Sequence, residues 1–213
     1  MHRKLSETAR AALTAACAPD TGGRPAAPGH RLLGATTAVV ADTCVRGALG
    51  FVLLLHRRKD GLVAEELYFA SREDSGAWGD TEHLSGSAGI ADLTRPEEAA
   101  AVLRGRSMTS LGESETLLHT GRPQADEGHE LLRFHTLLVS GNIGHLDIED
   151  TSAGASPASA RVRKPLMSQV ALLALFPEET VTVRTGPDAG TGVRALGELL
   201  DLSGSGVSGA SRA

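Results

Sequence analysis

The sequence predicts a mainly β protein, an antiparallel β-sandwich with one short helix at the N-terminus and another near the middle of the chain. Three observations support this prediction. Apolar and polar residues alternate with a period of two through several short runs. Turn residues such as Asp-Gly separate these runs. Apolar residues at helical spacing begin a helix in only two clear places. Whether the strands form one sandwich or two small β units is left open by the sequence.

Composition sets limits on the function. The chain has 213 residues and is 41% hydrophobic, which is enough for a globular core built from Leu, Val and Ala. Aromatic residues make up only 3%, so few rings are present to stack on bases or sugars. The net charge is −5 with both signs interspersed, and no basic stripe is present to neutralise phosphates or an anionic membrane surface. We therefore expect no nucleic-acid partner and no membrane partner.

The N-terminus and the two cysteines predict a cytoplasmic protein. Residues 1–17 begin with basic residues and end at Cys17, as a lipoprotein signal does, but Glu7 and Arg10 interrupt the apolar core that such a signal needs. The longest apolar run is far shorter than the roughly 20 residues of a membrane-spanning helix. Cys17 and Cys44 lie in unrelated segments, which is typical of a reducing compartment and not of a disulfide scaffold.

Residues 1–18 are predicted to form an amphipathic helix. Its apolar side chains recur at helical spacing in an Ala-rich segment and are Leu5, Ala9, Ala12, Leu13 and Ala16. Residues 19–30 are crowded with Pro and Gly, which predicts a linker because these residues break regular structure. The helix is therefore expected to sit apart from the body of the protein.

Residues 31–130 are predicted to be β-rich, with the first strands at TTAVVADTCV, GFVLLLHRR and LVAEELYFAS. Asp60-Gly61 lies between the last two, and this dipeptide favours a two-residue hairpin turn because both central positions need positive φ. Such a turn would place His56 opposite Glu65. One face of the hairpin is then strongly apolar and the other is mixed.

A polar loop and a short helix are predicted next. The loop REDSGAWGDTEHLSGSAG contains the only tryptophan, and we expect Trp78 to pin it to the core. Thr94 and Glu97 have the spacing of a capping box, in which each side chain accepts a hydrogen bond from the amide of the other residue. This spacing predicts a helix over about 95–104. One further strand is predicted at 116–119, followed by a polar loop.

Residues 131–202 contain four short strand patterns, LLRFHTLLV, HLDIED, VALLALF and ETVTVRTG. The first two are expected to pair as a hairpin through a three-residue loop, which places His135 opposite Glu149. Residues 193–202 fit either a helix or a strand, and the strand is preferred. The Gly- and Ser-rich tail 203–213 is predicted to be disordered.

The ending VTVR…LGELLDL resembles the closing hairpin of short immunoglobulin-like sandwiches in uncharacterised actinobacterial proteins. The resemblance extends over residues 131–202 and is carried by the strand pattern alone. It implies an immunoglobulin-like topology for this part of the chain. The fold class expected from the sequence is therefore an antiparallel β-sandwich that is immunoglobulin-like in its C-terminal part.

No sequence motif identifies a catalytic residue or a cofactor site. The segment 204–209 matches the dinucleotide fingerprint G-x-G-x-x-G and 190–195 nearly does, but the chain ends before the βαβ unit and the acidic residue that such a site requires. The sequence contains no P-loop, no G-x-S-x-G elbow, no H-E-x-x-H and no C-x-x-C. We therefore expect no cofactor.

Histidines and acidic residues in the C-terminal half form the best chemical candidate. Imidazole and carboxylate groups are what a zinc site or a general acid–base pair requires. The candidate metal ligands are His129, His135, His145 and Asp147. The expected hairpin separates the imidazoles of His135 and His145 by more than about 10 Å at the strand rise of about 3.4 Å per residue, which is too far for one ion. The preferred interpretation is a solvated face with a cross-strand His–Glu pair.

Three functions are consistent with these observations. The preferred one is a non-enzymatic cytoplasmic module that binds a protein or peptide partner, because edge strands and long polar loops are predicted and catalytic motifs are missing. The first alternative is a metal-assisted hydrolase that uses His129, His135, His145 and Asp147. The second alternative is an accessory subunit that docks on a larger assembly through its N-terminal helix.

Overall fold

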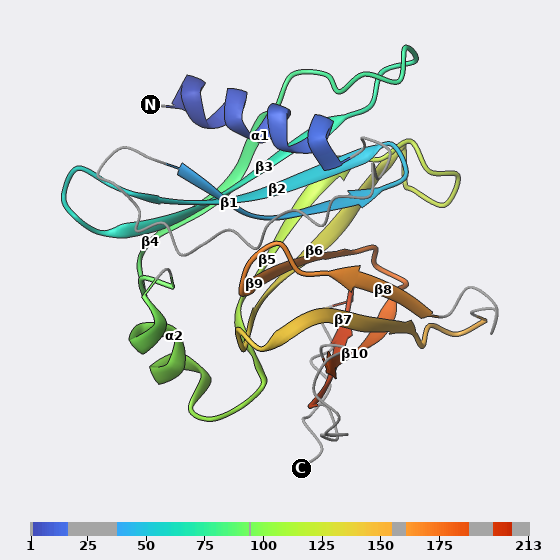
Figure 1. The fold of residues 1–213 in the computed structure, drawn as a ribbon. Coiled ribbons are helices and arrows are strands. Elements are labelled where there is room, and N and C mark those ends of the chain that lie inside the picture. Colours follow the sequence, from blue (N-terminus) through green and yellow to red (C-terminus); the bar gives the residue numbers. More distant parts are fainter. Residues whose placement is uncertain (1, 17–37, 94, 155–160, 188–197, 206–213) are drawn as a thin grey trace. The chain divides into compact units, whose positions relative to one another are not determined.

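The computed structural model describes residues 2–16, 38–93, 95–154, 161–187 and 198–205 (Figure 1). Within these residues the protein is mainly β, with three antiparallel sheets, an N-terminal helix and a short middle helix. None of the helices described has the length and apolar character of a transmembrane span. Several predictions concern segments outside the described residues, namely the linker 19–30, Cys17, the capping residue Thr94, the first part of 193–202 and most of the tail.

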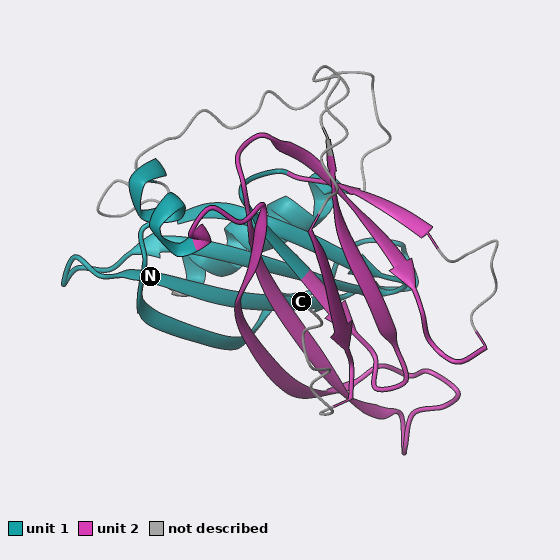
Figure 2. Ribbon diagram, turned by 90° about the horizontal axis from the view of Figure 1, so that it is seen from below, with its two compact units in different colours: residues 1–102, 167–172 teal, residues 103–166, 173–213 magenta. Residues whose placement is uncertain are grey.

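The chain divides into two compact units, and β9 contributes to both (Figure 2). Unit 1 comprises residues 1–102 and 167–172, and unit 2 comprises 103–166 and 173–213. In chain order the elements are α1 (His2–Ala16), β1 (Ala38–Arg46), β2 (Leu49–Arg57), β3 (Val63–Ser71), β4 (Glu82–Ile90), α2 (Pro96–Leu103), β5 (Met108–His119), β6 (His129–Val139), β7 (Ile143–Asp150), β8 (Arg161–Pro165), β9 (Val170–Leu175), β10 (Thr180–Pro187) and β11 (Leu199–Ser203).

Unit 1 is built on a four-stranded antiparallel sheet with the order β1-β2-β3-β4. β2 is buried along almost its whole length, as expected for a continuous apolar run in a central strand. β4 corrects the prediction, because the sequence EHLSGSAGI was expected to belong to a loop. Its side chains are mostly exposed and small, so it lacks apolar alternation, and its pairing with β3 makes it a strand.

α1 packs across one face of this sheet (Figure 1), so the expectation that the helix sits apart is wrong. Its apolar stripe of Leu5, Ala9 and Leu13 is buried in one cluster with Trp78. Gly50 permits this close approach, because a Cβ there would lie 2.8 Å from Leu13 Cδ2 and 2.8 Å from the indole ring. The prediction that Trp78 pins the β3–β4 loop is confirmed.

The β2–β3 hairpin has a register one residue away from the predicted one. Its loop is Lys59–Gly61, three residues long, and Gly61 has a φ of 85°. A type I turn followed by one left-handed glycine needs only that one positive φ, and it competes with the two-residue turn for the same Asp-Gly sequence. His56 therefore lies opposite Ala64 and not opposite Glu65.

Unit 2 contains a sheet with the order β11-β10-β7-β8, and β5 and β6 belong to a sheet with the order β5-β6-β9. The predicted β6–β7 hairpin is wrong, because β6 pairs with β5, and His135 lies opposite Glu113 instead of Glu149. The physical reason is burial. Leu137 and Val139 lie on the same face of β6, and both are fully buried. β6 therefore needs apolar neighbours on that face, and the polar strand β7 cannot supply them.

Other strand predictions are confirmed in part. Every residue of β9 is buried, as predicted for its continuous apolar run. In β10 the alternating apolar residues Val181 and Val183 are buried, and Thr182 between them is buried as well, with its hydroxyl donating to Asp201 at 2.6 Å. β11 bears out the strand preference for the described part of 193–202. β8 was missed, and β5 is longer than the predicted 116–119.

α2 confirms the middle helix predicted over about 95–104. Gly105 follows it with a φ of 80°, the left-handed conformation that commonly ends helices. At the other end, the Glu98 carboxylate accepts a hydrogen bond from the amide of Asp92 at 2.7 Å. The carboxylate of Glu98, one position after the predicted Glu97, therefore connects the start of the helix to the preceding segment.

The packing of α1 can be tested with Leu13→Ala. We expect this change to lower the free energy of unfolding by about 2–5 kcal/mol, because it leaves a cavity at a fully buried site. Leu62→Ala is the matched control, since Leu62 is 47% exposed, and its effect should stay within about 0.5 kcal/mol. Urea unfolding followed by Trp78 fluorescence measures both variants. Equal, small losses would contradict the packing of α1 on the sheet.

Candidate functional site

The four predicted metal-ligand candidates lie on two strands of different sheets. His129 and His135 are on β6, and His145 and Asp147 are on β7. Over the part of the chain that the structure describes, no group of three or more His, Cys, Asp or Glu side chains is placed to hold a metal ion. The structure therefore does not gather the four candidates into one site, and each has separate surroundings.

His135 is a buried imidazole with one defined hydrogen bond. Its Nε2 lies 3.2 Å from the carbonyl oxygen of Ser203, and Nε2 carries the proton because a carbonyl can only accept. Its Nδ1 lies 3.5 Å from Glu113 Oε1, without the geometry of a hydrogen bond. Burial lowers the pKa of His135, and the carboxylate of Glu113 and the bond to Ser203 only partly offset this effect.

His145 and Asp147 belong to a partly exposed charged face of β7. Asp147 Oδ1 lies 3.9 Å from His145 Nε2 and 3.4 Å from Arg163 Nε on the neighbouring strand β8. The next acidic residue on this face, Glu149, lies 3.5 Å from Arg161. Such cross-strand ion pairs are worth a few tenths of a kcal/mol in solvent. The arrangement corresponds to the solvated face preferred from the sequence, although its pairs are Asp–Arg and Glu–Arg.

A histidine–carboxylate–histidine bridge in unit 1 was missed by the sequence analysis. Glu66 Oε1 lies 3.1 Å from His56 Nε2, and Glu66 Oε2 lies 2.6 Å from His83 Nε2. The ring of His83 also lies against Tyr68, with 5.3 Å between ring centroids. The three residues of the bridge come from β2, β3 and β4. Only the corrected hairpin register, which puts His56 and Glu66 on one face, could have revealed it.

This bridge holds strands together and offers little to a substrate. His56 and Tyr68 are 3% and 2% exposed, and only His83 reaches solvent appreciably. Burial, together with the charge of Glu66, raises the pKa of Tyr68, so its hydroxyl stays protonated. Among the described residues, the Tyr68 hydroxyl and His56 Nδ1 have no hydrogen-bond partner. A buried group that no substrate can approach is a poor acid or base for catalysis.

The end of the β5–β6 hairpin carries four exposed side chains on one face. We call Leu117, His119, His129 and Leu131 the hairpin patch. Leu117 lies directly opposite Leu131, and His119 lies opposite His129. The leucines are 63% and 44% exposed, and none of the other large apolar side chains in the described residues is as exposed as Leu117. The imidazole rings are nearly perpendicular, with centroids 5.0 Å apart.

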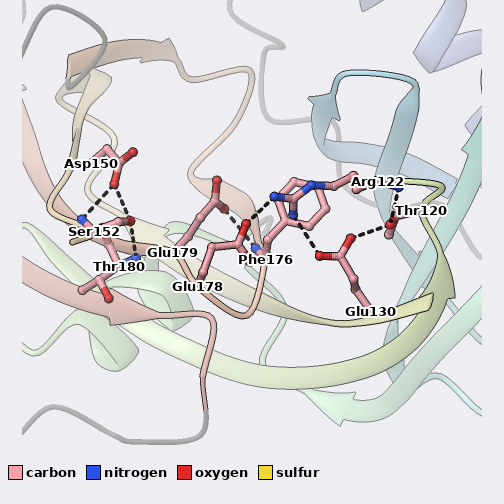
Figure 3. A network of polar contacts seen from close by, with 9 residues as sticks. All are labelled: Thr120, Arg122, Glu130, Asp150, Ser152, Phe176, Glu178, Glu179 and Thr180. Atoms are coloured by element: carbon pink, nitrogen blue, oxygen red, sulfur yellow. Dashed lines mark hydrogen bonds and ion pairs between the residues drawn. The ribbon is translucent and has the colours of Figure 1, made fainter. Parts of the chain in front are cut away.

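A partly buried ionic network, drawn in Figure 3, holds the hairpin through Glu130, which lies on the face of β6 opposite the patch. The buried carboxylate of Glu130 accepts hydrogen bonds from the Thr120 hydroxyl and from Arg122 Nη1, the latter at 3.1 Å. Arg122 also donates to Glu178, and its guanidinium carbon lies 3.7 Å from the centroid of the Phe176 ring. Burial by itself would raise the pKa of Glu178, but the hydrogen bond from Arg122 brings it below the ordinary value.

β5 is an edge strand of its sheet. Its last residues lack the charged side chains, prolines and bulges that usually keep an edge strand from pairing with another chain. β8, another edge, has Arg161, Arg163 and Lys164 and ends in a proline. In β5 the pairing with β6 is irregular between Ser110 and Gly112, and two glutamates follow. Residues 116–119 contain no Lys, Arg, Asp, Glu or Pro. The unprotected part of this edge is therefore the part beside the hairpin patch.

Comparison of the chain with protein-family models, with curated proteins and with solved structures gives no match in any of the three. The resemblance of residues 131–202 to immunoglobulin-like sandwiches therefore stays a prediction. The candidate site is the hairpin patch together with the adjoining edge of β5. It combines exposed apolar surface, two imidazoles and an anchored backbone, and these features can bind a partner or a ligand.

The network beneath the patch can be tested with Arg122→Met. This change leaves the buried Glu130 carboxylate without its cationic partner, so we expect the free energy of unfolding to fall by about 1–3 kcal/mol. Glu178→Gln is the control, because Glu178 is half-exposed and its pairing should contribute less than about 1 kcal/mol. Urea denaturation measures both. A larger loss for Glu178→Gln than for Arg122→Met would contradict this account of the network.

The burial of His135 predicts a pH dependence of stability. The folded protein has a pKa for His135 below the ordinary value of 6.5, so at intermediate pH the unfolded chain binds a proton that the folded chain does not. Stability should therefore fall as the pH decreases below about 6.5. Replacing the imidazole by an uncharged ring in His135→Phe should reduce the loss between about pH 7.5 and about pH 5.5. Identical losses in wild type and variant by urea denaturation would refute this.

Proposed function

We propose that the protein is a non-enzymatic binding module that takes up an extended segment of a protein partner along β5, beside the hairpin patch. The observation that carries this proposal is the directly opposed pair Leu117 and Leu131, exposed on an anchored hairpin at an unprotected sheet edge. Exposed apolar surface next to free edge strands is a common feature of binding sites for protein segments.

The leucine pair can supply useful binding energy. Its exposed fractions together amount to about one fully exposed leucine. Covering that surface would be worth roughly 1.5–3 kcal/mol before the costs of association. This is too little for tight binding by itself, so main-chain hydrogen bonds along the edge of β5 have to contribute as well. Strand addition supplies such bonds without demanding a particular partner sequence.

The side chains along β5 indicate what the partner segment contains. In strand addition, alternate side chains of the bound segment lie over one face of the sheet. An apolar side chain of the segment would cover Leu117 and Leu131. Farther along the same face, the partly exposed carboxylates of Glu115 and Glu113 share one largely buried guanidinium, that of Arg133, so this part of the face favours a basic side chain in the segment. We expect the partner to present an extended segment with an apolar and a basic residue on one face.

The two alternatives have less support in the geometry. A hydrolase that uses His129, His135, His145 and Asp147 would need groups that lie on strands of different sheets. Docking through α1 would need an apolar stripe, but that stripe is buried on the protein's own sheet. The immunoglobulin-like topology of 131–202 remains a proposal from the sequence pattern and is not needed for binding at β5.

A selection of random peptides against the full chain tests the proposal. Phage-displayed peptides that bind the wild-type protein should show an apolar and a basic residue an even number of positions apart, which places both on one face of an extended segment. We expect Leu117→Lys to weaken the enriched peptides by at least about tenfold, which corresponds to 1.4 kcal/mol. Val162→Lys is the matched control, because Val162 is also an exposed apolar residue of an edge strand and is 59% exposed.

Fluorescence anisotropy with the labelled peptides measures the affinities of wild type and both variants. Peptides that bind Leu117→Lys as tightly as wild type, or a stronger effect of Val162→Lys, would overturn the proposed site. A selection that enriches no peptide would also overturn the proposed site. Because both changes are at exposed positions, circular dichroism of the variants should match that of wild type.

A further inference from the structure

We propose that His119 and His129 together bind a divalent transition-metal ion of the zinc, nickel and copper class. This inference goes beyond partner binding, because it needs neither the leucines of the hairpin patch nor an extended segment. Imidazole is the side chain that these metals share as a preferred ligand. The two residues are directly opposed, at the last position of β5 and the first position of β6.

The separation of the two rings suits one shared ion. Their centroids are 5.0 Å apart. With metal–nitrogen bonds of about 2.0–2.1 Å, two imidazoles on a tetrahedral ion have their ring centroids roughly 5 Å apart as well. Both side chains are exposed, so small rotations of the rings can direct their nitrogens at the ion at little cost. The backbone therefore already brings the two rings to the centroid separation that a shared ion requires.

The tautomer of His129 is set by a hydrogen bond to the backbone. Its Nδ1 lies 3.1 Å from the carbonyl oxygen of Glu127. A carbonyl oxygen can only accept, so Nδ1 carries the proton of the neutral ring and Nε2 carries the lone pair. Histidines that bind metals commonly donate from the other ring nitrogen to a carbonyl or a carboxylate. His129 is thus held in the form that a metal ligand needs.

His119 is positioned by the glycines of the loop. A Cβ on Gly128 would lie 2.6 Å from His119 Nε2, so only glycine lets the ring lie there. Gly128 also has a φ of 80°, which favours glycine for a second reason. The loop is closed by hydrogen bonds from the amide of Thr120 to Gly128 at 2.7 Å and from the amide of His129 to Asp126 at 2.8 Å. These contacts fix the two ligand-bearing positions.

The charges around the pair favour a cation. The cationic side chain of the loop, Arg122, is directed to the carboxylates of Glu130 and Glu178. Asp126 and Glu127 lie in the same turn as the histidines and are exposed. Water completes the coordination, because the protein supplies two imidazole ligands. Magnesium and calcium ions should not bind, since they prefer oxygen ligands.

Isothermal titration of the full chain, freed of any purification tag, with zinc chloride and copper chloride tests the proposal. We expect one ion per chain, tighter binding of copper than of zinc, and weaker binding at lower pH because the ligands must be deprotonated. His119→Ala and His129→Ala should each lower the affinity at least about tenfold. His145→Ala is the control and should bind as wild type does.

Leu117→Lys separates this inference from the proposed function, because it should weaken peptide binding at least about tenfold and leave metal binding within about threefold of wild type. Single histidine variants that bind zinc as wild type does, or a wild-type chain that binds no zinc, would overturn the metal site. Circular dichroism without metal verifies that each variant is folded. Since both histidines are exposed, the spectra should be unchanged.

Discussion

Strand pairing decides which polar side chains of this protein can act together. A strand directs successive side chains to opposite faces, so a residue shares a surface only with residues that the register places beside it. His135 shows the effect. On β6 it lies opposite Glu113 of β5, whereas the acidic residues that follow it in the sequence belong to another sheet. The chemistry available at any point therefore depends on the partner strand.

In unit 1, the length of a hairpin loop decides which polar side chains lie on one face. The three-residue loop after β2 puts His56 and Glu66 on one face, and there the carboxylate bridges His56 and His83. A loop one residue shorter would change the register and break that bridge. Packing sets a further limit, because α1 can approach the sheet only where Gly50 leaves room for Leu13 and Trp78. Both constraints act through the backbone.

Apolar patterns in the sequence were sufficient to predict most strands, and failed where burial gives no periodic signal. β2 and β9 were predicted from continuous apolar runs, α1 from apolar residues at helical spacing, and α2 from a capping signal ahead of a short apolar stripe. β4 and β8 were missed because their side chains are mostly exposed and they are strands through backbone pairing. Of the candidate site, only His129 was identified. Its relation to His119 depends on a β5–β6 pairing that local patterns cannot supply.

The anchoring of the hairpin also bears on why its surface is available for binding. A buried ion pair is weak evidence for stability, because its attraction must first offset the desolvation of both charges. What Arg122 does is hold the hairpin in a defined position. Its planar guanidinium binds Glu130 of the hairpin and Glu178 of a distant turn while it lies over the Phe176 ring. This fixes the loop end of the β5–β6 hairpin from the face opposite the hairpin patch. On the patch's own face, Arg133 and His135 bind residues 203–205 farther along β6, and the four patch residues beyond them stay exposed and can meet a ligand or a partner.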